Sequence, residues 1–223
     1  MKRRPLPVAA ALTATAALLL TACGSGDDKS TANDKIVGAE QSTATPTKSA
    51  EPSAAAADNN PDGVDLSLPK DINLVFDWTK STNNNEAAAM DDAANFIRAI
   101  YHGVDKRTAD DAAVTTYSTG GGLTYAKTQI ESRLKGDWTA TGTRRQYQAT
   151  TRATSNGNAV EVAFCVDSSK FYGKEVKTGK VLETTPSISD FAYFKIIMVK
   201  FPTGDSLWQA SKVFVETKAA QCQ

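Results

Sequence analysis

Apolar residues in the second half of the chain recur with two different periods, and the first of these predicts a helix. Between Met90 and Tyr101 they lie three and four residues apart, which places them on one helical face. Residues 83–86 precede this stretch and carry Asn side chains suited to a helix N-cap. We expect the helix to end near His102 and Gly103, because glycine readily adopts the left-handed C-cap conformation.

Two shorter helices are expected next. Thr108 is a suitable N-cap for the first of them, with Asp110 and Asp111 in its opening turn. The second is expected from Tyr125 to Leu134. The run Gly120–Gly122 between them lacks the Lys and Ser or Thr of a phosphate-binding loop, so we interpret it as a flexible hinge.

Beyond Trp138 the period changes to two, which is typical of strands. Asn156-Gly157 is a strong hairpin signal between a polar, β-prone segment and the alternating residues 160–167, in which Cys165 faces away from the core. Residues 191–201 are apolar on both faces, as in an inner strand, and 207–216 form the last strand. The short segment 72–78 before the helices is also strand-like. Helices followed by an antiparallel meander predict an α+β domain.

The first residues have the order of an export signal. Lys2, Arg3 and Arg4 precede the uncharged stretch Val8 to Leu20, which is shorter than the ~20 residues that a membrane-spanning helix needs. The stretch ends in Leu-Thr-Ala-Cys, with Cys23 last, and this is similar to the lipobox of bacterial lipoproteins. The resemblance implies that the Cys23 thiol is lipidated and becomes the new N-terminus, although an ordinary signal peptide or a cytosolic helix remains an alternative.

Composition divides the chain into three parts. Residues 1–22 are the expected lipoprotein signal peptide, and residues 23–69 are rich in Ser, Thr, Ala, Asp and Pro. The latter segment has few large apolar side chains and more acidic than basic ones, so we expect a disordered tether. Residues 70–223 are long enough for one globular domain. This order predicts a lipid-anchored protein on the extracytoplasmic face of the bacterial membrane, with the membrane as its first partner.

Charge and motif content exclude several function classes. Twenty-five basic residues balance 25 acidic ones, so nothing points to a nucleic-acid partner. The sequence has no Cys and His cluster for zinc and no calcium loop, so we expect no metal and no cofactor.

The residues that carry acid–base or ionic chemistry are also explained by ordinary roles. His102 is the only imidazole, and a capping or surface position accounts for it. The acid pairs 91–92 and 110–111 suit solvated helix faces as well as a paired-acid active site. Residues 144–147 contain two arginines and a tyrosine, which we interpret as a solvated strand face rather than an anion or polymer site. The chain is therefore expected not to be an enzyme.

Once Cys23 is lipidated, two cysteines remain. Cys165 and Cys222 then have only one pairing open to them, and an oxidising compartment favours a disulfide between them. Two free, inert thiols are the alternative.

The order of helices and sheet resembles the NTF2-like, or cystatin-like, fold, in which a curved antiparallel sheet wraps around N-terminal helices as a cone. Cys165-Val166-Asp167, Lys177 to Lys180, Gly204 with Trp208, and Cys222 are similar to a family of actinobacterial secreted lipoproteins of unassigned function. The resemblance spans about residue 68 to the end. The spacing of Gly204 and Trp208 is wider than that family's pattern.

The cone fold implies a cavity between helices and sheet. Tyr101, Trp138, Phe191 and Tyr193 are candidates to line it, with core packing as the alternative for all four. We expect a non-enzymatic binding or accessory module for an envelope protein, a cell-wall component or a small apolar ligand. An NTF2-like enzyme of the cyclase or isomerase type and a structural assembly protein of the envelope are the alternatives.

Overall fold

In the part of the chain that the structure describes, one strand precedes three α-helices and five strands follow them. The structure is a computed structural model that describes residues 61–203 and 206–223. Its strands are β1 (Ile72–Asp77), β2 (Trp138–Ala153), β3 (Ala159–Glu175), β4 (Val181–Leu182), β5 (Phe191–Lys200) and β6 (Trp208–Thr217). Its helices are α1 (Asn84–Asp105), α2 (Ala112–Tyr117) and α3 (Gly120–Lys135), with the short 3-10 helices η1 (Pro61–Gly63), η2 (Ile188–Asp190) and η3 (Ala220–Cys222).

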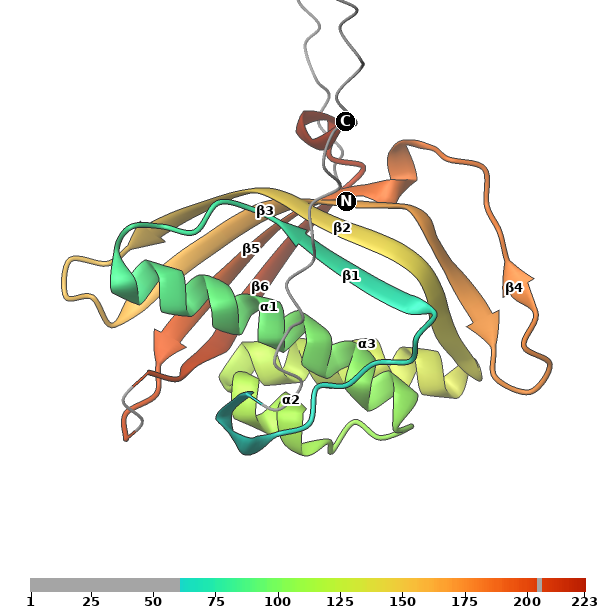
Figure 1. Ribbon diagram of the computed structural model, residues 1–223, viewed down its shortest axis with the longest axis horizontal. Helices are drawn as coiled ribbons and strands as arrows, with labels where there is room; N and C mark the ends of the chain where they lie inside the picture. Colours follow the sequence, from blue (N-terminus) through green and yellow to red (C-terminus); the bar gives the residue numbers. More distant parts are fainter. Residues whose placement is uncertain (1–60, 204–205) are drawn as a thin grey trace, which may run out of the picture. The chain divides into compact units, whose positions relative to one another are not determined.

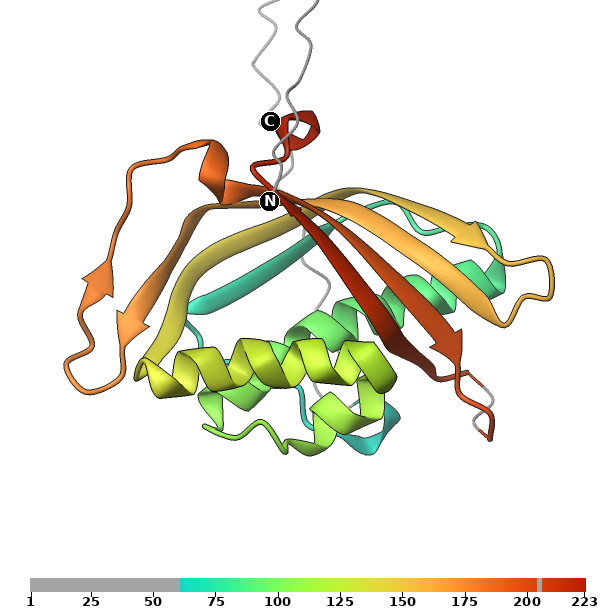
Figure 2. The same ribbon diagram turned by 180° about the vertical axis from the view of Figure 1, so that it is seen from behind.

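The strands form one curved sheet, and the α-helices pack on its concave side (Figure 1, Figure 2). The strand order is β1-β2-β3-β5-β6, with β4 paired to β3. Neighbouring strands are antiparallel except for β1 and β2, which are parallel. The predicted α+β class, with helices packed on a curved, mainly antiparallel sheet, is confirmed. The parallel pairing of β1 is a feature that the sequence pattern did not predict.

Alternate residues of the central strands supply the core. Val160, Val162 and Phe164 of β3 are fully buried towards the helices. Phe164 pairs with Phe194 of β5, and the two rings stack with their centroids 5.5 Å apart. Cys165 faces the opposite, convex side, as the alternation predicted. The position of β5 between β3 and β6 also confirms the inner strand expected from its apolar run.

The predicted hairpin at Asn156-Gly157 joins β2 to β3. The backbone N–H of Thr154 donates to the carbonyl of Ala159 over 2.8 Å, which closes the turn. Gly157 has a φ of +67°, a conformation that other residues adopt at a cost. The turn residues therefore set the register of the two longest strands.

The folded domain begins before the predicted boundary at Lys70. Leu66 is 2% exposed and belongs to the core, and Val64 and Leu68 pack against that core. The three residues alternate with polar ones, so a short extended segment turns one apolar edge inward. The prediction of a tether through residue 69 is wrong for this segment, because average composition concealed the alternation. Residues 23–60 of the predicted tether, and the predicted signal peptide, lie outside the described residues.

The first helix is longer than predicted. Asn83 is the N-cap, and its side chain accepts hydrogen bonds from two backbone N–H groups, as expected. However, α1 continues through Gly103 to Asp105. A Cβ atom at Gly103 would lie 2.7 Å from the Ile130 side chain. Gly103 thus allows α3 to pack closely on α1 and does not end the helix.

The α2 N-cap is Asp111 and not Thr108 as predicted. The Asp111 carboxylate accepts a hydrogen bond from the backbone N–H of Ala113 over 2.9 Å.

The glycine run also differs from its predicted role. Gly120–Gly122 form the first turn of α3 and not a hinge. At Gly122 a Cβ atom would collide with the carbonyl of Ala210, so the absence of side chains brings α3 against the backbone of β6.

Candidate binding site

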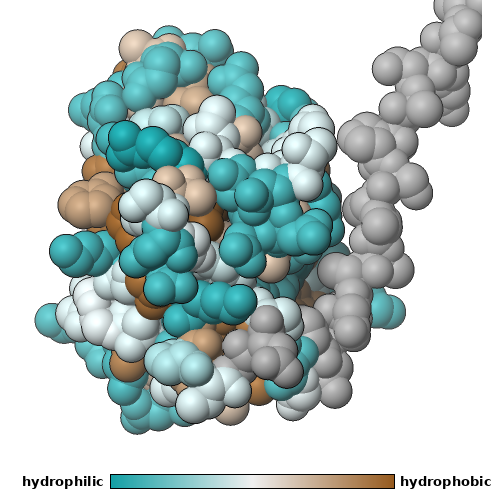
Figure 3. Space-filling view, turned by 90° about the vertical axis from the view of Figure 1, so that its left-hand side faces the viewer, coloured by the Kyte–Doolittle hydropathy of each residue, from teal (hydrophilic) through white to brown (hydrophobic). Residues whose placement is uncertain are grey.

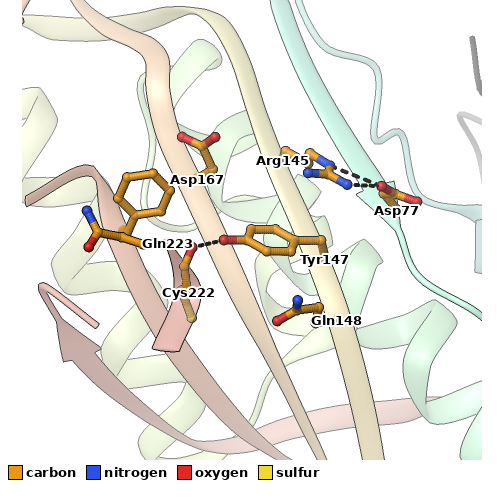
Figure 4. Close-up of a pocket in the computed structure, with 8 residues that line it drawn as sticks. Asp77, Arg145, Tyr147, Gln148, Asp167, Cys222 and Gln223 are labelled. Atoms are coloured by element: carbon orange, nitrogen blue, oxygen red, sulfur yellow. Dashed lines mark hydrogen bonds and ion pairs between the residues drawn. The ribbon is translucent and has the colours of Figure 1, made fainter. Parts of the chain in front are cut away.

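A cavity of about 510 Å³ opens on the convex face of the sheet, on the side away from the α-helices (Figure 4). Four strands and the C-terminal residues contribute to it. Its lining residues are Asp77 of β1, Arg145, Tyr147 and Gln148 of β2, Asp167 of β3, Phe191 of β5, and Cys222 and Gln223.

Strand register brings these residues together from distant parts of the sequence. Asp77 lies opposite Tyr147 in the β1–β2 pair, and Asp167 lies opposite Arg145 on one side and Phe191 on the other. All of them occupy the face that alternates with the core positions. A register shift follows Tyr147, and Gln148 has a φ of +54°. This irregularity places consecutive β2 residues, Tyr147 and Gln148, on the cavity wall.

The cavity combines opposite charges with aromatic rings. Arg145 Nε donates to Asp77 Oδ2 over 3.0 Å, and an Arg145 Nη donates to the same oxygen. The Arg145 guanidinium carbon lies 4.8 Å from the centroid of the Tyr147 ring. Burial raises the pKa of the Tyr147 hydroxyl, and the Asp167 carboxylate adds to the effect. The tyrosine is therefore a neutral donor at neutral pH.

The predicted disulfide is present and holds one wall of the cavity. Cys165 and Cys222 are bonded, with their Cα atoms 5.3 Å apart. The Tyr147 hydroxyl donates to the carbonyl of Cys222, and the backbone N–H of Ala219 donates to the carbonyl of Phe191 over 3.1 Å. These contacts fix the C-terminal residues on the convex face. The structure thus confirms the pairing of Cys165 with Cys222.

The four aromatic residues predicted to line one cavity do not come together. Phe191 lines the convex cavity, and Tyr193 packs beside the disulfide on the same face. Tyr101 is 2% exposed in the core on the concave side, with its ring edge-on to Phe171. Trp138 lies over the backbone of Gly136 at the start of β2. The prediction failed because odd-numbered positions of β5 face away from the helices.

A buried carboxyl on α1 is a feature that sequence reasoning missed. Asp92 is 7% exposed and accepts hydrogen bonds from the backbone N–H of Trp208 over 2.8 Å and from Asn95 Nδ2 over 3.2 Å. Burial raises its pKa to about 7. Asp91 is exposed and forms an ion pair with Lys80. Helical spacing placed Asp92 four residues before the buried Phe96, and this was the available signal.

His102 is buried, in contrast to the predicted capping or surface role. It is 5% exposed, and its Nδ1 lies 3.0 Å from Asp111 Oδ2. Its Nε2 lies 3.5 Å from Asp65 Oδ2. The imidazole therefore links α1 to the N-cap of α2 and to the segment that contains Leu66. The histidine is central to the packing of the N-terminal part of the domain.

Within residues 61–203 and 206–223, no group of three or more His, Cys, Asp or Glu side chains is arranged to hold a metal ion. Over the same residues, no helix has the length and apolar content needed to cross a membrane.

Comparison with known proteins gives only distant similarities. No family model and no curated protein matches the sequence. Among solved structures, the chain is similar to the intermembrane space region of the chloroplast protein ARC6, at 5% identity and a TM-score of 0.39, over 61% of this chain and 98% of that one. It is also similar to a ketosteroid isomerase-like protein from Erwinia carotovora atroseptica, at 14% identity and a TM-score of 0.34, over 56% and 92% of the two chains.

A third similarity is to a putative polyketide cyclase from Xanthomonas campestris, at 13% identity and a TM-score of 0.27, over 59% of this chain and 90% of that one. At these identities and scores, the likenesses carry no inference about activity.

Proposed function

We propose that the chain is a lipid-anchored protein of the extracytoplasmic membrane face, and that its α+β domain is a non-enzymatic binding module. The sequence around Cys23, which lies outside the described residues, is the basis for the anchor. The Cys165–Cys222 disulfide supports this placement, because disulfides persist mainly in oxidising compartments.

The convex cavity is the single observation that carries the binding role. Its rings, from Tyr147 and Phe191, offer flat apolar surfaces, and its planar polar groups, from Arg145, Gln148 and Asp167, offer donors and acceptors. This combination suits a polyhydroxylated ligand better than the small apolar ligand expected from the sequence. We therefore propose that the ligand is a glycan segment of the cell wall, which a membrane-anchored domain meets directly.

Phase partitioning tests the anchor. Full-length protein expressed in a bacterial host should enter the detergent phase, and Cys23→Ala should remove it from that phase or block its processing. Ser25→Ala, two residues away, is the matched control and should behave as the wild type. Wild-type protein found wholly in the aqueous phase with an intact N-terminus would refute the anchor.

Titration with soluble glycan fragments of the cell wall tests the cavity. The mature protein should bind them saturably, and Asp167→Asn and Gln148→Ala should each weaken binding about tenfold, because each removes a hydrogen-bonding group from the lining of the cavity. Asp110→Asn is the control, since Asp110 is exposed and pairs with Lys127 beside the helices. Equal affinities for all four proteins would reject the convex cavity as the site.

An enzyme is the second candidate, and Asp92 is the observation that favours it. A carboxyl with a pKa of about 7 has the property of a general acid or base. Its oxygens already accept hydrogen bonds from Trp208 and Asn95, which indicates a structural role. Unchanged glycan affinity in Asp92→Asn would agree with the binding module.

A structural assembly protein has less support. Phe214 and Val215 of the edge strand β6 are 55% and 38% exposed. On the face shown in Figure 3, however, hydrophobic areas are small and separated by hydrophilic residues. A large protein interface normally needs a more continuous apolar centre.

A further inference from the structure

Strand β6 forms one edge of the sheet, and α3 covers the first half of that edge (Figure 2). The backbone N–H of Thr119, the α3 N-cap, donates to the carbonyl of Ala210 over 2.9 Å. A Cβ atom at Gly121 would lie 3.2 Å from the carbonyl oxygen of Ser211. The strand also bulges at Ser211, where its register with β5 shifts. The start of α3 therefore closes the edge as far as residue 211.

Residues 212–217 leave the second half of the edge open. Within residues 61–203 and 206–223, their backbone groups bond to β5 and to no other element. The chain then turns away, because Lys218 has a φ of +56° and the N–H of Ala219 donates to the carbonyl of Phe191 in β5. An edge strand of this kind presents unpaired main-chain donors and acceptors to a further strand.

Side chains of this open segment alternate between the two faces of the sheet. Val215 lies opposite the buried Phe194 of β5, so it turns towards the helical side. Lys212, Phe214 and Glu216 alternate with it and turn towards the convex side. Phe214 is the most exposed large apolar side chain among the described residues. An exposed ring in the middle of an open edge indicates a contact surface.

The two charged side chains beside the ring have no ion pair. Neither Lys212 nor Glu216 lies within ion-pair distance of an opposite charge in the part of the chain that the structure describes. Glu216 accepts a hydrogen bond of 3.3 Å from the Gln221 amide. The two charges are four residues apart, about 13 Å along a strand, so they do not reach each other. Opposite charges therefore lie at equal distances on either side of Phe214.

We propose that residues 212–217 pair antiparallel with the same residues of a second copy of the chain, about a two-fold axis at Phe214. In this register the two Phe214 rings meet on the convex face, and Lys212 of each copy lies opposite Glu216 of the other. On the other face, Val213 of each copy lies opposite Val215 of the other. The pairing joins the two sheets into one.

The order of the charges favours a second copy as the partner. Charges on an edge strand usually oppose association, and like charges placed directly opposite each other are destabilising. In this segment the two-fold axis sets unlike charges opposite each other instead. A slip of one residue would turn Phe214 and its counterpart to opposite faces, so the register is specified.

Main-chain hydrogen bonds supply much of the affinity when strands pair at their edges. The contact therefore needs no broad apolar centre. Strand β6 contributes no residue to the convex cavity, so the pairing does not rest on glycan binding.

Cysteine cross-linking of the full-length protein in the expressing bacterium tests the proposal. Phe214→Cys places a thiol on the two-fold axis, where opposed Cβ atoms are about 5 Å apart and close to the range of a disulfide. Mild oxidant should give a covalent dimer of twice the chain mass.

Lys195→Cys is the matched control. Lys195 lies opposite Phe214 on β5 and is exposed on the same face. Three strand spacings, about 14 Å, separate the two copies of residue 195 in the proposed dimer, so this variant should give about tenfold less dimer.

Exchange of the charges tests the register. In the Phe214→Cys protein, Lys212→Glu and Glu216→Lys each set like charges opposite each other twice, and each should lower the dimer fraction about tenfold. The two changes together should restore it, because unlike charges face each other again. The three positions are exposed, so urea unfolding should be the same in all these variants, which separates loss of pairing from loss of folding.

The proposal is overturned if Phe214→Cys gives no dimer or no more dimer than Lys195→Cys. A conjugate of Phe214→Cys with a protein of different mass, in place of the dimer, would assign the edge to another partner and also overturn it. Single charge reversals that leave the dimer fraction unchanged, or a double exchange that does not restore it, would overturn the two-fold register.

Discussion

The Asp92 carboxylate accepts a hydrogen bond of 2.8 Å from the backbone N–H of Trp208, a residue 116 positions later in the chain. This bond joins the middle of α1 to the first residue of β6. Trp208 is fully buried, so water does not replace the carboxylate as acceptor without opening the core. One polar side chain thereby ties the helical layer to the far end of the sheet.

The first prediction concerns pH. The Asp92 pKa is about 7 in the folded protein against an ordinary 3.8, chiefly because burial disfavours the charged form. Because the pKa of Asp92 is raised in the folded protein, protonation of Asp92 stabilises the fold fully below about pH 4. This stabilisation is lost as the pH rises to about 7. As the pH rises from about 4 to about 8, the free energy of unfolding of Asp92→Asn, measured in urea, should increase by roughly 4 kcal/mol relative to that of the wild type.

Asp91→Asn is the matched control for this measurement. Asp91 is the next residue along α1, but its side chain is half exposed and pairs with Lys80. The difference in free energy of unfolding between Asp91→Asn and the wild type should change by less than about 1 kcal/mol between about pH 4 and about pH 8. A constant difference between Asp92→Asn and the wild type at every pH would contradict the prediction.

The second prediction concerns the buried histidine. His102→Phe preserves the bulk of the ring but leaves the buried Asp111 carboxylate without its imidazole partner. We expect a loss of roughly 2 to 3 kcal/mol in the free energy of unfolding at pH 7. Limited proteolysis should also cleave near Asp65 sooner, because His102 contacts that segment. A variant as stable and as resistant to protease as the wild type would refute the role assigned to His102.

Features governed by local pattern were predictable from the sequence. Alternation along residues 160–167 identified the two faces of β3, and Asn156-Gly157 located the hairpin. The Cys165–Cys222 bond followed from the number of cysteines once Cys23 is set aside. Each of these depends on residue order or on counting and needs no knowledge of distant packing.

The polar interior was not predictable in the same way. Asp92 is stabilised by Trp208, and Arg144 is surrounded by Tyr101 and Phe194, which come from other elements. Whether a polar residue is buried depends on the partners that tertiary packing supplies. Single-sequence reasoning therefore assigned these residues to solvated faces, the usual location of charged side chains.

The third prediction concerns the start of α3. In Gly122→Ala the new Cβ atom collides with the carbonyl of Ala210, so α3 and β6 have to move apart. Overpacking of this kind costs about 1 to 3 kcal/mol, more than alanine's higher helix propensity returns. Gly173→Ala is the control, because its Cβ meets only the Trp138 ring at an ordinary 3.6 Å. Equal unfolding free energies for both variants would contradict the close approach of α3 to β6.

The fourth prediction links the disulfide to the convex cavity. Replacing Cys165 and Cys222 by alanine opens a loop of 57 residues, and the chain-entropy relation gives a loss of about 4 kcal/mol. The Tyr147 hydroxyl then holds the carbonyl of residue 222 without covalent support, so the C-terminal wall should detach. We therefore expect hydrogen exchange in the variant to accelerate at residues 219 and 222, whose backbone N–H groups are hydrogen-bonded in the native chain, before global unfolding.

Chemical reduction provides the matched comparison for that double variant. Mild reductant should reproduce both effects in the wild type and leave the double variant unchanged, since the latter has no bond to break. The unreduced mature protein should also be two daltons lighter than its dithiol form. If exchange at the C-terminal residues is equally slow with and without the bond, the disulfide does not hold the cavity wall, and its contribution is to global stability alone.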